Sequence, residues 1–179
     1  MNCNLTERLA GATSHLGVIR KHYVNALACL RVAEDEEHAI GMVFSKFQNN
    51  DQARECYEAV VAKSKQLEDK VELYSKEIAS FERTETILTL LLENAAEKDQ
   101  LEMSLQNAKT TAQLAHDQHA AILLEMESHD PIPDDLAEAL EVAHEATVTA
   151  DDALGQLIQE SAEVSKAYET IMAEWAELV

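Results

Sequence analysis

The sequence has few of the residues that interrupt helices or build large globular cores. Among 179 positions there are 4 Gly, 2 Pro and only 4% aromatic residues. Neither Gly nor Pro occurs between Gly41 and Pro131. Both residues are unfavourable in helix interiors, and Ala, Leu, Glu and Lys are the best helix formers. The composition therefore predicts long helices around a thin core of Ala, Leu, Ile and Val, and no segment is typical of a strand.

Signals for export, membrane insertion and disulfide bonding are also missing. The sequence has an odd number of cysteines, Cys3, Cys29 and Cys56, and no Cys-x-x-Cys spacing. This predicts reduced thiols in a cytoplasmic protein, and the cytoplasm of a host cell or a virion would also fit. Cys29 and Cys56 lie near apolar helical positions, so we expect both in the core. No run approaches the roughly 18 apolar residues of a membrane span, and the N-terminus has no continuous apolar region. We expect neither a secretory signal nor membrane binding.

Motifs for catalysis are absent as well. There is no Gly-x-Ser-x-Gly sequence, no phosphate-binding loop and no Cys with an evident helper, so we predict no enzyme, no catalytic residue and no cofactor. A ferritin-like metal-binding bundle stays a third hypothesis, because metal sites in bundles use acid and His pairs three residues apart. We predict no metal ligands, since most of the candidates lie off the expected core. The pairs are Asp35 with His38, Glu141 with His144, and His116 with His119.

Basic residues are missing from a long stretch near the C-terminus. No Lys or Arg occurs between Lys109 and Lys166, whereas thirteen Asp and Glu do. Residues 1–83 have 11 basic and 13 acidic residues, and residues 84–179 have 3 and 21. The length of the chain favours one domain, 1–179, with a near-neutral half over 1–83 and a strongly acidic helical hairpin over 84–179.

Two breaks divide the expected helices. Both prolines lie in the segment SHDPIPDD, after which Asp134 or Asp135 is a suitable N-cap. In the segment QNNDQ, Asn49 or Asn50 can end one helix and Asp51 can cap the next. We therefore predict helices over about 4–48, 51–129 and 134–179.

The last predicted helix contains a heptad repeat. Apolar or small residues recur at alternating steps of three and four over about six heptads, which is the pattern of coiled-coil packing. We call these a and d positions the seam. We expect a packing core at Leu140, Leu154, Leu157, Val164, Tyr168, Ile171 and Trp175, with Ala143 and Thr147 also in the seam.

The first two predicted helices have similar seams. The first seam begins at Leu9 and includes Phe44 and Phe47, and the second slips in phase near 88–92. If the middle helix is continuous it is roughly 115 Å long, and the other two fold back on its halves. If it breaks near Asn94–Asp99, four helices form an up-and-down bundle. In both cases we predict an all-α protein of long, coiled-coil-like helices in an elongated antiparallel hairpin or bundle.

The acidic residues of the last helix lie away from its seam. With Leu140 at position a, nine of its twelve Asp and Glu fall at b, c or f. Solvated helices usually mix charges, because Glu–Lys pairs at i,i+4 stabilise them and like charges cost about as much. We define the acidic face as Asp134, Asp135, Glu138, Glu141, Glu145, Asp152 and Glu163.

These features predict a helical structural or assembly subunit that acts through protein–protein contacts. A single-sign surface attracts a partner with a basic surface, and thin helical hairpins bury little apolar surface alone, so we expect a homo-oligomer or larger assembly. By analogy alone, a small viral or phage protein has this profile. The alternative is a DNA mimic that inhibits a DNA-binding enzyme; direct nucleic-acid binding is not expected. A merely solvated face stays possible.

Overall fold

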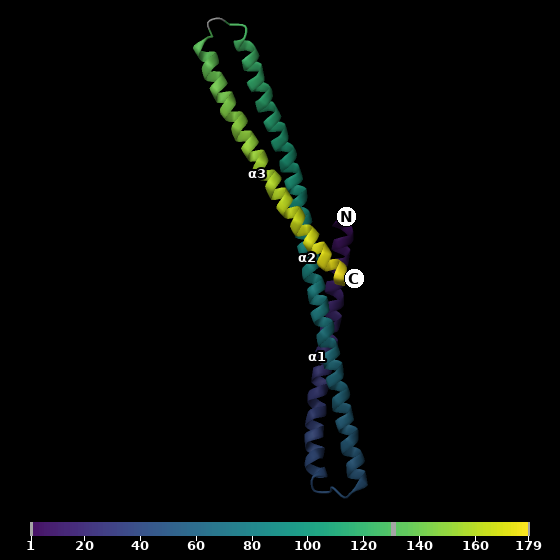
Figure 1. The fold of residues 1–179 in the computed structure, drawn as a ribbon. Helices are drawn as coiled ribbons and strands as arrows, with labels where there is room; N and C mark the ends of the chain where they lie inside the picture. Colours follow the sequence, from purple (N-terminus) through teal and green to yellow (C-terminus); the bar gives the residue numbers. More distant parts are fainter. Residues whose placement is uncertain (1, 130–131, 179) are drawn as a thin grey trace. The chain divides into compact units, whose positions relative to one another are not determined.

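Three long helices make up almost all of the protein. The computed structural model describes residues 2–129 and 132–178, and their helices are α1 (Asn2–Phe44), α2 (Asp51–Met126) and α3 (Asp134–Leu178) (Figure 1). No strand occurs in these ranges, so the all-α prediction is confirmed. The observed helix bounds differ from the predicted ones by at most four residues. No helix among the described residues has an apolar stretch suited to crossing a lipid bilayer.

Helix α2 is continuous through Asn94–Asp99, the segment where the sequence allowed either a continuous helix or a break. Its 76 residues include Asn94, whose side-chain Nδ2 donates a hydrogen bond of 3.0 Å to the Leu90 carbonyl oxygen one turn earlier. The amide is therefore satisfied within the helix and does not compete with it. Leu91 and Ala95 are buried around it. The phase slip near 88–92 is therefore a shift of the seam within one continuous helix. Of the two predicted arrangements, the one with three helices is observed.

The chain divides into two compact units within α2: unit 1 is Met1–Thr89 and unit 2 is Leu90–Val179. This boundary lies six residues after the predicted change in charge. In unit 1, α1 and the first part of α2 run antiparallel (Figure 1). The contacts show this directly, because partners further along α1 meet partners earlier in α2. They are Thr13 with Glu85, Arg20 with Glu82, Glu36 with Lys63, and Phe44 with Tyr57.

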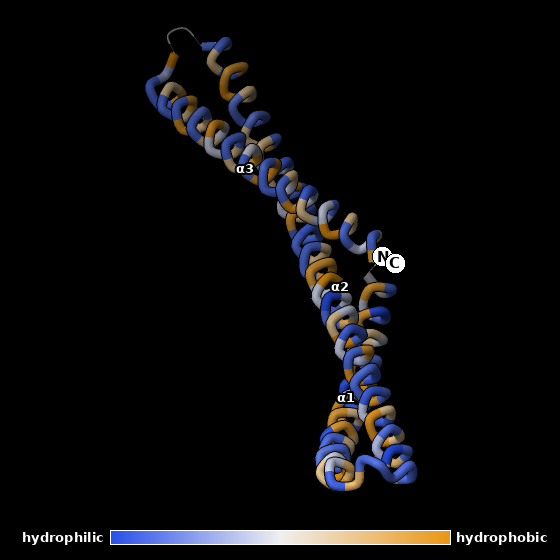
Figure 2. The backbone as a smooth tube through the Cα atoms, turned by 60° about the horizontal axis from the view of Figure 1, so that its bottom comes forward, coloured by the Kyte–Doolittle hydropathy of each residue, from blue (hydrophilic) through white to orange (hydrophobic). Residues whose placement is uncertain are grey.

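The core of unit 1 is a narrow line of apolar side chains between its helices. Figure 2 shows apolar residues recurring along α1 and α2 among hydrophilic ones. Leu16 and Leu88 are 1% exposed, and Ile19 and Leu30 are also buried. The predicted seam therefore faces the neighbouring helix. Phe47, however, lies beyond the end of α1 and is 57% exposed, so its predicted place in the seam is wrong.

Unit 2 is a second antiparallel hairpin, formed by the rest of α2 and by α3. Lys98 of α2 contacts Tyr168 of α3, and His116 of α2 contacts Asp151 of α3. The second contact lies later in α2 but earlier in α3 than the first, so the two helices are antiparallel. The whole predicted seam of α3 is buried or half-buried, while the positions around it are mostly exposed. Ala143 and Thr147 are the most deeply buried, since small side chains let the two backbones approach.

Two predicted helix caps are wrong by one or two residues. Asn50 caps α2, because its Oδ1 accepts a hydrogen bond of 3.1 Å from the Ala53 N–H. Asp51 is instead the first helical residue. At α3 the Pro133 carbonyl accepts hydrogen bonds from the following turn, so Asp134 and Asp135 lie inside the first turn. Negative side chains there favour the positive end of the helix dipole.

The two cysteines predicted in the core are exposed. Cys29 and Cys56 are free thiols on the surface of unit 1. Each directly precedes a seam residue, Leu30 and Tyr57 respectively. One residue turns the side chain by about 100° around a helix, which places both thiols on the flank of the hairpin.

Candidate interaction surface

The surface of unit 2 is dominated by carboxylates. Its sequence has 20 acidic and 3 basic residues, a net charge of −17, against −3 for unit 1. All twelve acidic residues of α3 are exposed. This includes every residue of the acidic face: Asp134, Asp135, Glu138, Glu141, Glu145, Asp152 and Glu163. The structure thus places these seven side chains in solvent, on the side of α3 away from its seam.

The predicted packing core of α3 is only partly covered. All seven residues have intermediate exposure: Leu140, Leu154, Leu157, Val164, Tyr168, Ile171 and Trp175. A helix that packs against one neighbour covers only one side of its a and d residues. The seam therefore holds α3 to α2 but leaves apolar surface on the flanks of the hairpin.

The carboxylates of unit 2 have few cationic partners. Asp151 contacts His116 Nε2 at 3.2 Å. Lys98 Nζ lies 5.9 Å from the centre of the Tyr168 ring, where a cation–π contact holds it. Within the described part of unit 2, no carboxylate forms an ion pair with a Lys or Arg of that unit. Its negative charge is therefore not neutralised locally.

Unit 1 is different, because its charges pair across and along the helices. Arg20 bonds Glu82 at 2.7 Å and Lys63 bonds Glu36 at 2.8 Å between α1 and α2. A third pair along α2 joins Lys76 to Glu72 at 2.6 Å, and this hydrogen bond and positive charge lower the pKa of Glu72. Each exposed pair contributes little energy. Acidic residues with Lys or Arg partners from the same unit therefore occur in unit 1, where basic and acidic residues are nearly balanced in number.

An apolar groove lies next to the acidic face. Its floor comes from α2 and α3 and includes Ile122, Ala143 and Val142, the last of which is 62% exposed. Asp135 and Glu138 stand at its edge. A partner could thus bury apolar side chains in the groove while its cations meet the acidic face. Val142 was not predicted as a surface residue of interest, although an apolar residue at a c position, outside the seam, is a signal for it in the sequence.

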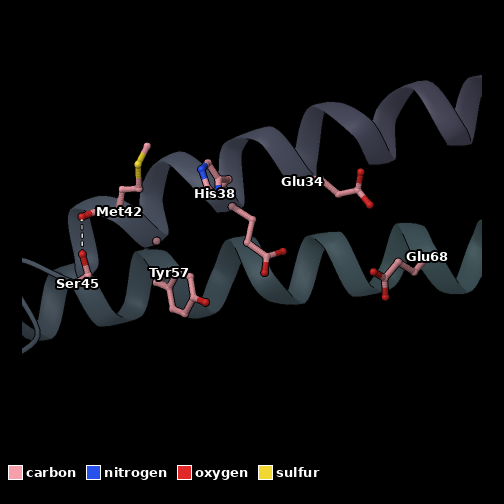
Figure 3. A pocket seen from close by; sticks show the side chains of 8 residues that line it. Glu34, His38, Met42, Ser45, Tyr57 and Glu68 are labelled. Carbon is pink, nitrogen blue, oxygen red and sulfur yellow. Dashed lines mark hydrogen bonds between the residues drawn. The ribbon is translucent and has the colours of Figure 1, made fainter.

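A second groove lies in unit 1 where Gly41 faces Tyr57. A Cβ at Gly41 would be 3.4 Å from Tyr57 Cε2, which is ordinary van der Waals contact, so the ring packs against α1 at this position. Figure 3 shows Glu34, His38 and Met42 on one helix and Tyr57 and Glu68 on the other. The dashed line is the hydrogen bond from Ser45 Oγ to the Met42 carbonyl, 2.8 Å long. Among the residues that the structure describes, nothing in this groove beyond its acidic side chains indicates a ligand.

The predicted His and acid pairs do not form a multi-ligand metal site. Among the residues that the structure describes, no group of three or more His, Cys, Asp or Glu side chains is placed to hold a metal ion. His38 lines the groove of unit 1. His119 and His144 do come together from α2 and α3, which sequence analysis did not foresee. Detecting that pair from sequence would require the register between the two helices.

Comparison with known proteins gives no further guide. No protein-family model matches the chain, and neither curated proteins nor solved structures include a significant match.

Proposed function

We propose that this chain is a non-enzymatic helical interaction subunit whose acidic face binds a basic surface on a partner protein. The observation that supports this most is the set of exposed carboxylates in the described part of unit 2 that form no ion pair with a Lys or Arg of the same unit. Such a surface repels itself, and a few lysines would relieve the repulsion. A cationic partner removes that cost on binding and is attracted over distances of about a Debye length.

The exposed area supports assembly. The chain exposes 12640 Å². A folded monomer of 19.9 kDa typically exposes about 8,700 Å² by the usual scaling with mass. The difference of about 4,000 Å² is comparable with the area buried in an obligate interface. Two-helix hairpins with half-covered seams are the source of this excess, and packing against other subunits would bury it.

The first experiment is affinity purification of the full chain, with identification of partners and a charge variant beside it. The variant E138Q/E141Q/E145Q/D152N removes four charges of the acidic face and leaves the first turn of α3 intact. We expect it to lose the basic partner that the wild type retains. The control E34Q/E55Q/E58Q/E68Q removes four exposed charges from unit 1 and should retain it. Equal recovery by both variants would contradict the proposal.

Assembly is tested separately by sedimentation velocity. We expect the wild type to sediment as an oligomer or with a stoichiometric partner. Val142→Glu adds a charge to the exposed groove of unit 2 without touching the seam, and should dissociate the assembly while circular dichroism stays helical. Leu154→Asp disrupts the seam itself and should abolish both the assembly and the helical circular dichroism signal. If the wild type is monomeric and binds no partner, the acidic face is only a solvated surface, and the assembly proposal is refuted.

A DNA mimic is the second candidate, because the charge spacing of the hairpin favours it. Unit 2 has 20 acidic residues along a hairpin whose α3 has 45 residues. At 1.5 Å per residue this is about one charge per 3.4 Å, close to the phosphate spacing of one DNA strand. If the partner binds DNA, duplex DNA should compete with this chain for it. A partner that binds the chain equally well in excess DNA excludes the mimic.

A further inference from the structure

Two histidines from different helices face each other in unit 2. His119 belongs to α2 and is half-buried at a seam position, and His144 belongs to α3 and is exposed. Their ring centres lie 5.7 Å apart with an angle of 42° between the ring planes. The pair bridges the hairpin near its loop end, seven residues before α2 ends at Met126.

We propose that His119 and His144 together bind a divalent transition-metal ion such as Zn²⁺ or Ni²⁺. Imidazole nitrogen is a preferred ligand of these ions. A zinc–nitrogen bond of about 2.0–2.1 Å places a bound ring centre about 3.2 Å from the ion, so two rings on one ion have centres about 5–6 Å apart. The observed separation of 5.7 Å lies in this range.

The charge around the pair favours a cation. Unit 2 has a net charge of −17, and Glu141 and Glu145 lie one turn before and one residue after His144. Both are exposed and form no ion pair with a Lys or Arg of unit 2. A field of one sign raises the local concentration of cations. The carboxylates attract any divalent ion, whereas the imidazoles select transition metals over Mg²⁺ and Ca²⁺, which prefer oxygen.

The neighbouring histidine limits the site to two protein ligands. His116 lies one turn before His119, and its Nε2 is held 3.2 Å from Asp151. Within the described ranges, no third His, Cys, Asp or Glu side chain is placed to hold an ion together with the pair. Water would complete the coordination, so the affinity is lower than that of a four-ligand structural zinc site. The ion would link α2 to α3 and stabilise unit 2.

The test is a titration of the chelator-treated full chain with Zn²⁺, followed by calorimetry and thermal unfolding. We expect one ion per chain and, taking unit 2 as a unit of 90 residues, a rise in Tm of about 10–20 °C at a free Zn²⁺ concentration about 100 times Kd. His119→Asn and His144→Asn should each weaken binding at least tenfold. The control His129→Asn removes an exposed histidine of unit 2 outside the pair and should bind Zn²⁺ like the wild type.

Two results would overturn the proposal. One is unchanged Zn²⁺ binding by the H119N/H144N double variant, which would assign the ion to the carboxylates. The other is an equal rise in Tm with Mg²⁺. If a variant unfolds, nitrogen NMR of the wild-type imidazoles decides instead: Zn²⁺ should shift the resonances of His119 and His144 and leave His38 unchanged. No shift at the pair also refutes the site.

Discussion

Removing negative charge from α3 should stabilise the protein. The triple variant E138Q/E141Q/E145Q removes four like-charge pairs at i,i+3 or i,i+4 spacing. These are Asp134 with Glu138, Asp135 with Glu138, Glu138 with Glu141, and Glu141 with Glu145. Each such pair costs about 0.2–0.5 kcal/mol in a helix, and Gln has nearly the helix propensity of Glu. We expect a gain of about 1–2 kcal/mol.

The assay is thermal unfolding followed by circular dichroism at about 0.01 M salt, where screening is weak. For a unit of 90 residues the gain corresponds to a rise in Tm of about 4–15 °C. At 1 M salt the difference between variant and wild type should nearly vanish, because the screening length falls to about 3 Å.

The matched control is Glu72→Gln, which removes a charge that has a partner. Lys76 lowers the pKa of Glu72, so the carboxylate stabilises the fold at pH values above its unfolded pKa, and this contribution is lost as pH falls through the lowered folded pKa. At pH 7 this variant should lower Tm slightly. A fall in Tm for the triple variant as well would show that the acidic face makes stabilising contacts and would refute the reasoning.

Four further variants, one of them an exposed control, test the packing and the helix cap, each by urea unfolding at pH 7. Leu16→Ala truncates a side chain that is 1% exposed and should cost about 2–5 kcal/mol, whereas Leu114→Ala, at 58% exposed, should cost less than about 0.5 kcal/mol. Ser64→Ala removes a buried hydroxyl without a hydrogen-bond partner among the described residues and should stabilise by about 1 kcal/mol; destabilisation would mean that the hydroxyl is bonded. Asn50→Ala removes the α2 cap and should cost about 1 kcal/mol, and no change would contradict its capping role.

The helices and the inward side of α3 could be predicted because heptad periodicity is a local property. Alternating steps of three and four place Ala143 and Thr147 on one side of a helix whatever its neighbour is. The degree of burial was not predictable in this way. It depends on how many helices surround the seam, and with one neighbour Leu154 and Trp175 remain half-exposed.

The errors arise where one residue changes the outcome. Cys29 and Cys56 were assigned to the core because they adjoin seam residues, yet a step of one residue moves a side chain to the flank. Asn50 and Asp51 are both good caps, and only the observed bond to Ala53 decides between them. The continuity of α2 at Asn94 could not be decided from composition, and in the structure the Asn94 side chain bonds the Leu90 carbonyl within the helix.

Contacts between helices were the least predictable feature. The heptad phase of each helix can be determined from its own sequence, but it does not determine which turn of α2 lies beside which turn of α3. The pairing of His119 with His144 follows from that register alone. The groove at Val142 could not be predicted for the same reason, because residues of both α2 and α3 line it.

The most direct test of the account measures how the affinity of the recovered partner depends on salt. If carboxylates on the outside of α3 are the contact, Kd should rise steeply between about 0.05 and 0.5 M salt, and the rise should be much smaller for E138Q/E141Q/E145Q/D152N. An affinity that stays the same up to 1 M salt, and is equal in wild type and variant, would contradict it.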